Sequence, residues 1–153
     1  MNDFIEPRLA HVADFSVEVA APIVIGETAA GLRRIVPITG GRATGRIEGA
    51  IEPGGADFQI LRNDGVTELE ARYTIVTASG TRIYVINRGI RSGPKDVMDA
   101  LARGEAVDPE KIYFRATPSF ETGAADYQWL MRRLFLSTGV RRPDRVELRL
   151  YEC

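Results

Sequence analysis

The sequence predicts an all-β protein, a small antiparallel β-barrel of about eight or nine strands with one or two short helices. Two observations predict this fold class. Apolar and polar residues alternate over most of the chain, and 15 glycines and 8 prolines separate the alternating segments at short intervals. There is no strand–helix–strand crossover, internal repeat or linker, so residues 1–153 are expected to form a single barrel domain. Closing such a sheet removes its exposed edges.

The alternation places the strands in chain order. Apolar side chains occupy every second position between Leu9 and Val19, which predicts the first strand. Further strands are predicted at residues 34–39, 44–51, 56–62, 67–77, 81–88, 111–117 and 144–152. Gly45 and Gly49 lie within this pattern, as expected where a barrel wall bends sharply.

Two segments carry helical patterns. Residues 94–103 are predicted to form a helix, because their apolar side chains lie one turn apart and a glycine follows. Residues 128–138 fit a helix by the spacing of Leu130 and Leu134, and a strand by an alternation that includes Phe135.

Composition excludes several classes of function. Twenty basic residues oppose 21 acidic ones, and this balance offers no attraction to nucleic acid. The longest uncharged apolar stretch, residues 19–26, is much shorter than the ~20 residues of a membrane-spanning helix. No secretory signal is visible at the N-terminus, so a cytoplasmic location is expected. One cysteine and one histidine exclude a disulfide framework and make a metal site improbable, and no cofactor is predicted.

A series of short motifs runs along nearly the whole chain. In order, they are Gly40-Gly41, Gly45, Gly49, Pro53-Gly54-Gly55-Ala56-Asp57, Ala71-Arg72, Gly80, Ile83-Tyr84, Gly89, Tyr113-Phe114-Arg115, Pro118, Phe120-Glu121-Thr122 and Tyr127-Gln128-Trp129-Leu130. This ordered set resembles the domain-of-unknown-function family 3237, also called the UPF 0311 group. The resemblance implies a calycin-like or allene-oxide-cyclase-like barrel and favours a strand for residues 128–138. It implies no particular activity, and fold alone would not establish one.

A polar cluster is predicted at one end of the barrel. Barrels of about eight strands either fill their interior with side chains or enclose one small ligand. In the functional interpretation, Arg72 and Arg115 bind or polarise an anionic or carbonyl oxygen. Asp57 or Glu121 acts as general acid or base, with a pKa raised by burial, and Tyr84 donates a hydrogen bond.

An aromatic wall is predicted to line the mouth of the barrel and bind substrate. It consists of Phe120, Tyr127 and Trp129. In the structural interpretation of the same polar residues, the two arginines pair with the two carboxylates and fix strand ends and register. Both faces of residues 67–77 carry plausible interior side chains, so the pattern leaves open which face points inward.

The resulting hypothesis is a small β-barrel that binds a small, partly apolar organic molecule with an oxygen-rich end. A cofactor-independent acid/base enzyme of the isomerase, lyase or hydratase type is favoured, because the chain offers carboxylates, arginines and tyrosines but lacks groups for redox, metal or thiol chemistry. The alternatives are a non-catalytic lipocalin-like carrier and a structural barrel that assembles into oligomers. A homodimer or higher oligomer agrees with the near-neutral charge. A dry apolar interior would favour the carrier, whereas carboxylates converging with an arginine at an open pocket would favour catalysis.

Overall fold

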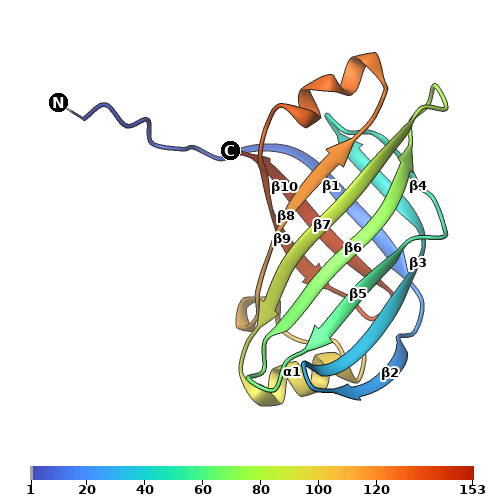
Figure 1. Ribbon diagram of the computed structural model, residues 1–153, viewed down its shortest axis with the longest axis vertical. Coiled ribbons are helices and arrows are strands. Elements are labelled where there is room, and N and C mark those ends of the chain that lie inside the picture. Colours follow the sequence, from blue (N-terminus) through green and yellow to red (C-terminus); the bar gives the residue numbers. More distant parts are fainter. Residues whose placement is uncertain (1) are drawn as a thin grey trace.

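The computed structural model describes residues 2–153, and ten strands in this part of the chain form one closed antiparallel sheet (Figure 1). The strands are β1 (Ala10–Val19), β2 (Ile23–Thr28), β3 (Gly31–Gly45), β4 (Gly49–Ile51), β5 (Ala56–Leu61), β6 (Thr67–Val76), β7 (Arg82–Ser92), β8 (Tyr113–Glu121), β9 (Phe135–Arg141) and β10 (Arg145–Glu152). The helical elements are α1 (Lys95–Ala102) and the 3-10 helices η1 (Pro109–Lys111) and η2 (Ala125–Met131).

The sheet closes because β1 pairs with β10 on one side and with β3 on the other. At two places in the barrel wall, two strands placed end to end take the place of one full-length strand. β1 and β2 pair with successive halves of the long strand β3, and β4 and β5 lie end to end between β3 and β6. The ten strands therefore build an eight-stranded antiparallel barrel with short helices, which confirms the predicted fold class.

The alternation on β6 shows which face points inward. Leu69, Tyr73 and Ile75 are buried in the barrel, whereas Arg72 between them lies on the outer wall. Successive side chains of a strand point to opposite faces, so one inward position fixes all the others on that strand. The buried inward side chains of the other strands join these in one hydrophobic core.

The structure differs from the predicted strands near the N-terminus. The strand predicted at residues 34–39 is only the middle of the much longer β3. β2 was not predicted, because its first three residues, 23–25, are consecutive exposed apolar side chains without alternation. The strand predicted at 44–51 is interrupted at residues 46–48, between β3 and β4. Gly45 at this interruption has a φ of +106°, a backbone conformation that residues other than glycine rarely adopt.

The strand favoured for residues 128–138 was wrong for residues 128–134 and right for residues 135–138. The first part of this segment belongs to η2, and β9 begins only at Phe135. The helical turn is held by the side chain of Gln128, which donates to the carbonyls of Thr122 and Ala124. Leu130 is thereby buried over the end of the barrel, a position that a continuous strand along the wall could not give it.

Short helices cover both ends of the barrel. η2 lies at the top of Figure 1, and α1 lies at the bottom. No helix within residues 2–153 is long and apolar enough to cross a membrane.

Gly49 tests the close packing of the wall. A Cβ atom at this position would lie 2.3 Å from the carbonyl oxygen of Val76, so Gly49→Ala must displace backbone. We expect Gly49→Ala to lower the free energy of unfolding by about 1–3 kcal/mol, measured by urea denaturation. The control is Gly123→Ala, where a Cβ meets nothing within 4 Å, and we expect it to stay within about 1 kcal/mol of the wild type. Equal effects of the two substitutions would contradict this packing argument.

Candidate functional site in the barrel interior

The barrel encloses a small cavity with one polar side. About 40 Å³ is available to the centres of water molecules, enough for a few waters and less than a typical ligand site. Apolar side chains from β1, β3, β6, β8 and β10 form most of its lining. The polar lining consists of Asp57, Gln59, Tyr73, Asn87, Arg91 and Arg141.

Asp57 is held in place by neighbours on three strands. Its carboxylate accepts hydrogen bonds from Gln59 Nε2 at 2.7 Å and from the backbone N–H of Glu70 at 3.1 Å. Gln59 Oε1 in turn accepts from Arg34 Nε at 2.7 Å. Because a guanidinium only donates and a carboxylate only accepts, the Gln59 amide has one orientation that suits both neighbours. Arg34, Gln59 and Asp57 thus form a directed hydrogen-bond chain into the cavity.

Burial dominates the electrostatics of Asp57. Loss of hydration raises the pKa of this carboxyl above its usual value of 3.8, although the hydrogen bond from Gln59 and the positive charges of Arg91 and Arg34 act in the opposite direction. A carboxyl with a raised pKa is a better acid/base catalyst near neutral pH than an ordinary surface aspartate.

Arg91 is the most deeply buried charge in the described chain. It is 2% exposed, and its Nε has no hydrogen-bond partner among residues 2–153. Its guanidinium lies 5.3 Å from the centre of the Phe114 ring, a cation–π contact. Burial, together with repulsion from Arg34 and Arg141, lowers the pKa of Arg91 to about 10. Asn87 Oδ1 and the Tyr73 hydroxyl are also buried without a partner in the protein.

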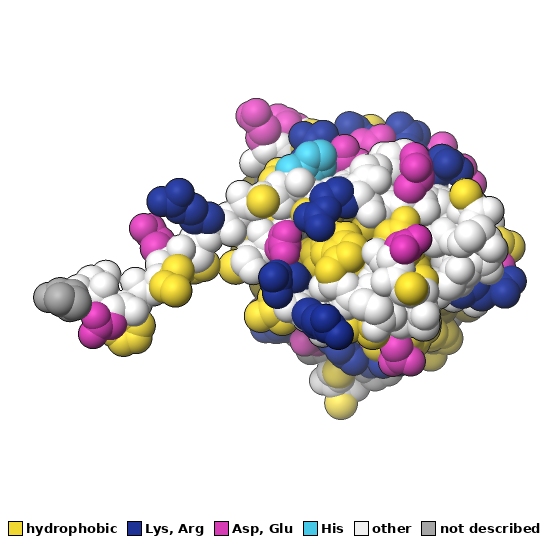
Figure 2. Space-filling view, turned by 90° about the horizontal axis from the view of Figure 1, so that it is seen from above, with side chains coloured by type: hydrophobic (Ala, Val, Ile, Leu, Met, Phe, Trp, Pro, Cys, Tyr) yellow, Lys and Arg dark blue, Asp and Glu magenta, His cyan; other side chains and the backbone are white. Residues whose placement is uncertain are grey.

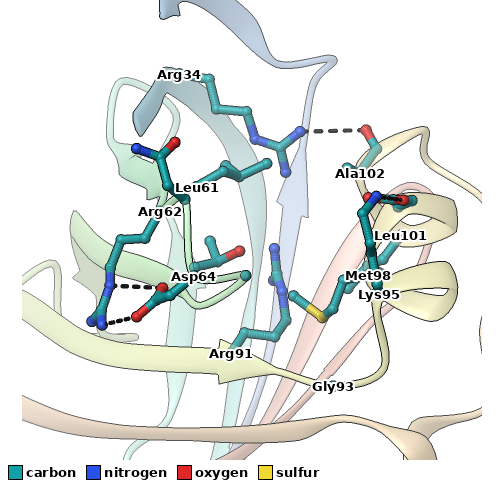
Figure 3. Close-up of a pocket in the computed structure, with 14 residues that line it drawn as sticks. Arg34, Leu61, Arg62, Asp64, Arg91, Gly93, Lys95, Met98, Leu101 and Ala102 are labelled. Carbon is teal, nitrogen blue, oxygen red and sulfur yellow. Dashed lines mark hydrogen bonds and ion pairs between the residues drawn. The ribbon is translucent and has the colours of Figure 1, made fainter. Parts of the chain in front are cut away.

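A larger groove lies outside the cavity, at the α1 end of the barrel (Figure 3). It has a volume of about 530 Å³ and runs between α1 and the loop that joins β5 to β6. Arg91 lines both the groove and the cavity, so its side chain forms the boundary between them. Arg34 also lines the groove, and its Nη1 reaches the carbonyl of Ala102 at the end of α1, 3.4 Å away.

The structure places only one of the predicted catalytic residues in this cavity. Asp57 points inward, but Arg72, Tyr84, Arg115 and Glu121 lie on the outer wall or at its rim. Arg72 donates to the Tyr84 hydroxyl at 3.3 Å on that outer face. The reason is the period of the strands: these four side chains alternate with buried neighbours, and therefore point away from the core. The five residues do not form one cluster.

The predicted aromatic wall lies at the other end of the barrel. Phe120 packs edge-to-face on Phe135, with ring centres 5.2 Å apart, and Trp129 lies 5.9 Å from the same ring. Trp129 is covered by the guanidinium of Arg46, and Tyr127 packs against the core from η2. Figure 2 looks onto this end and shows it covered, with hydrophobic side chains near its centre and charged ones around them. None of the three lines the cavity or the groove.

Sequence reasoning missed the interior arginines, although a signal was present. Inward positions on β7 continue from Val85 through Asn87 to Arg91, but the predicted strand ended at residue 88. On β3 the inward positions of Val36 and Ile38 extend back to Arg34. A polar residue that occupies the next inward position of an apolar alternation indicates a polar group inside the barrel.

The chemistry of this site is that of oxygen and nitrogen groups. Among residues 2–153, no three histidine, cysteine, aspartate or glutamate side chains lie close enough together to share a metal ion. The cavity brings together a carboxyl with a raised pKa, buried guanidinium groups and neutral hydrogen-bonding groups on an apolar floor. Such a set can move one proton and stabilise a negatively charged oxygen.

Comparison with known proteins agrees with the barrel fold. A family model described as a protein of unknown function (DUF3237) matches residues 7–153. A UPF0311 protein of Bradyrhizobium diazoefficiens is 44% identical over 142 residues, 93% of each chain. The crystal structure of a conserved protein of unknown function from Rhodopseudomonas palustris has a TM-score of 0.88 at 43% identity, covering 97% of this chain and 99% of that one. An enzyme from Penicillium herquei shares the fold, with a TM-score of 0.70 at 17% identity over 98% of this chain and 99% of that one.

The raised pKa of Asp57 predicts how stability depends on pH. The unfolded chain ionises this carboxyl near pH 3.8, whereas the folded protein holds its proton to higher pH. The stabilising contribution is therefore present at low pH and lost as the pH rises through the folded-state value. Asp57→Asn removes this titration, so we expect its stability relative to the wild type to increase between pH 4 and pH 8, measured by thermal unfolding.

Asp14→Asn is the matched control for this pH series. Asp14 lies on the outer wall, where a hydrogen bond from Arg149 lowers the pKa of its carboxyl. Its contribution has the opposite sign, so Asp14→Asn is expected to lose stability relative to the wild type at neutral pH and to approach it in acid. A parallel trend for the two variants would contradict the raised pKa of Asp57.

Proposed function

The chain belongs to the DUF3237 family of proteins of unknown function. From the geometry of its interior, we propose that the barrel binds a small, partly apolar organic molecule with an oxygen-rich end. We further propose that Asp57 exchanges a proton with this molecule. The reaction would be a cofactor-independent isomerisation, addition or elimination.

The observation that carries this proposal is a half-buried carboxyl, the one carboxyl among residues 2–153 that lines this cavity of mixed polarity. Asp57 has its two hydrogen bonds from Gln59 and the Glu70 backbone, and it also lines the cavity. Structural aspartates in a β-sheet are usually exposed or paired with a cation, because an isolated buried charge is costly. Among the described residues, Asp57 has no cationic partner within ion-pairing distance. A proton-transfer role accounts for keeping a carboxyl there.

The positions of the groups suit proton transfer next to a carbonyl. When ionised, Asp57 would take a proton from the carbon beside the carbonyl, and the electron pair of the broken C–H bond would form a C=C bond. The carbonyl oxygen would become an enolate oxygen, to which Arg91 can supply positive charge. The protonated Asp57 would then return its proton to another atom of the ligand. The raised pKa strengthens the base and keeps the acid form available.

A non-catalytic carrier is the second candidate. It is favoured by the fact that only one carboxyl among residues 2–153 lines the cavity, whereas isomerases and hydratases commonly use separate acid and base groups. In a carrier, Asp57, Asn87 and Tyr73 would serve only to hydrogen-bond the oxygen-rich end of the ligand. The two candidates share the binding site and differ in whether a proton moves.

Proton exchange distinguishes the two candidates. Phenylpyruvate is a suitable probe, since its ring matches the apolar lining and its carbonyl and carboxylate match the polar side. We expect the wild-type protein in D₂O near pH 7 to accelerate loss of the benzylic proton signals in the NMR spectrum. Asp57→Asn should reduce that acceleration about 100-fold or more, in the range of general acid–base effects.

Asp14→Asn, on the outer wall, is the control and should retain the wild-type rate. Methyl resonances of Val36, Leu69 and Leu148, recorded in the same samples, report whether phenylpyruvate enters the cavity. Shifted methyl resonances without faster exchange would indicate the carrier. Exchange that is equally fast in Asp57→Asn would rule out the acid/base role of Asp57.

A further inference from the structure

Two guanidinium groups face each other where the groove at the α1 end meets the wall of the inner cavity. Arg34 is 7% exposed and Arg91 is 2% exposed. In Figure 3 their guanidinium groups point toward one another across the groove, Arg34 from β3 and Arg91 from β7. Arg141, which lines the cavity beneath, lowers the pKa of both by repulsion. Like charges in such an arrangement repel each other strongly, because the surroundings are poorly hydrated.

Acidic residues near the groove do not balance these charges. The groove has two carboxylates of its own, but Asp64 pairs with Arg62 and Asp99 pairs with Lys95. Within residues 2–153, neither Arg34 nor Arg91 has a carboxylate within 4.0 Å. The hydrogen bonds of Arg34 go to neutral acceptors, the Gln59 side chain and the carbonyl of Ala102.

The interior therefore carries more positive than negative charge. Three arginines (Arg34, Arg91 and Arg141) and the carboxyl of Asp57 lie within electrostatic range of one another. Asp144 also acts on Arg141, but its carboxyl is exposed and pairs with Arg145. Burial raises the pKa of Asp57, so this carboxyl compensates the arginines less. A protein that buries unpaired guanidinium groups commonly uses them to bind an anion.

We propose that the ligand of the barrel is an organic anion, whose carboxylate is bound between Arg34 and Arg91 and whose apolar part points into the cavity beneath, which must widen to admit it. This inference rests on the proposed function only in placing the ligand inside the barrel. It deepens that function by naming the substrate class.

The orientation follows from where the charged and apolar groups lie. Arg91 lines both spaces, so an anion bound to it has the groove on one side and the cavity on the other. The cavity floor is apolar, with Val36, Leu69 and Leu148 among its lining, and would receive the hydrocarbon part. Asp57 then faces an atom close to the carboxylate, so the proton transferred would come from a carbon near the charged group.

Benzoate and benzamide test this proposal, because they have nearly the same shape and differ in charge. Their dissociation constants are measured from the methyl shifts of Val36, Leu69 and Leu148 in a low-chloride buffer. We expect benzoate to bind about tenfold tighter or more than benzamide, as charge-assisted hydrogen bonds provide. In Arg91→Gln the preference should fall to about threefold or less, and Arg34→Gln serves as a second variant should Arg91→Gln fail to fold.

Arg88→Gln is the matched control, since Arg88 lies on the same strand as Arg91 but on the outer wall, paired with Glu70. It should keep the full preference for benzoate. Equal binding of benzoate and benzamide would overturn the anionic ligand while leaving the interior site intact. Absence of methyl shifts with both probes would instead overturn the interior site itself, and with it the proposed function. Chloride shifting the same methyls as strongly as benzoate would overturn the organic nature of the ligand.

Discussion

The hydrogen bonds between β1 and β3 close the sheet, and the properties of the interior depend on that closure. Once the ladder is continuous, each strand has one register, and a slip by one residue would exchange its inner and outer faces. Glycines at the tightest positions, such as Gly49 against Val76, allow the wall to follow the required curvature. The same register that buries Leu69 and Tyr73 also brings Asp57, Asn87 and Arg91 inside.

Buried charges in such a barrel need a reason, because the desolvation of each ion costs several kcal/mol. The hydrogen bonds from Arg34 to Gln59 and from Gln59 to Asp57 offset part of this cost. Among the described residues, Nε of Arg91 has no hydrogen-bond partner, and neither Arg91 nor Arg34 has a carboxylate within ion-pairing distance. Proteins retain such arrangements at functional sites more often than for stability, since apolar replacements of similar volume are often as stable.

The two ends of the barrel have different roles. At the η2 end, Leu130 and the ring cluster around Phe135 complete the hydrophobic core. At the α1 end, Arg91 separates a groove of about 530 Å³ from the cavity behind it. The proposed ligand would span both spaces, with its charged group beside Arg91. This division separates the aromatic residues, which stabilise the fold, from the charged residues, which carry the proposed chemistry.

The sequence by itself determined the all-β barrel, most of the strand positions and the helix α1, because alternation and turn residues act locally. It named Asp57 as a candidate site residue, but only the structure showed that this side chain points inward. It could not determine η2, where Gln128 caps a turn over the barrel end, or the unalternating β2. Nor could it bring Arg34 and Arg91 together, since these residues lie 57 positions apart and neither pairs with the other's strand in the sheet. Only the closed tertiary structure placed them on the same groove, because closure determines which strands face each other through the interior, and local patterns do not encode that arrangement.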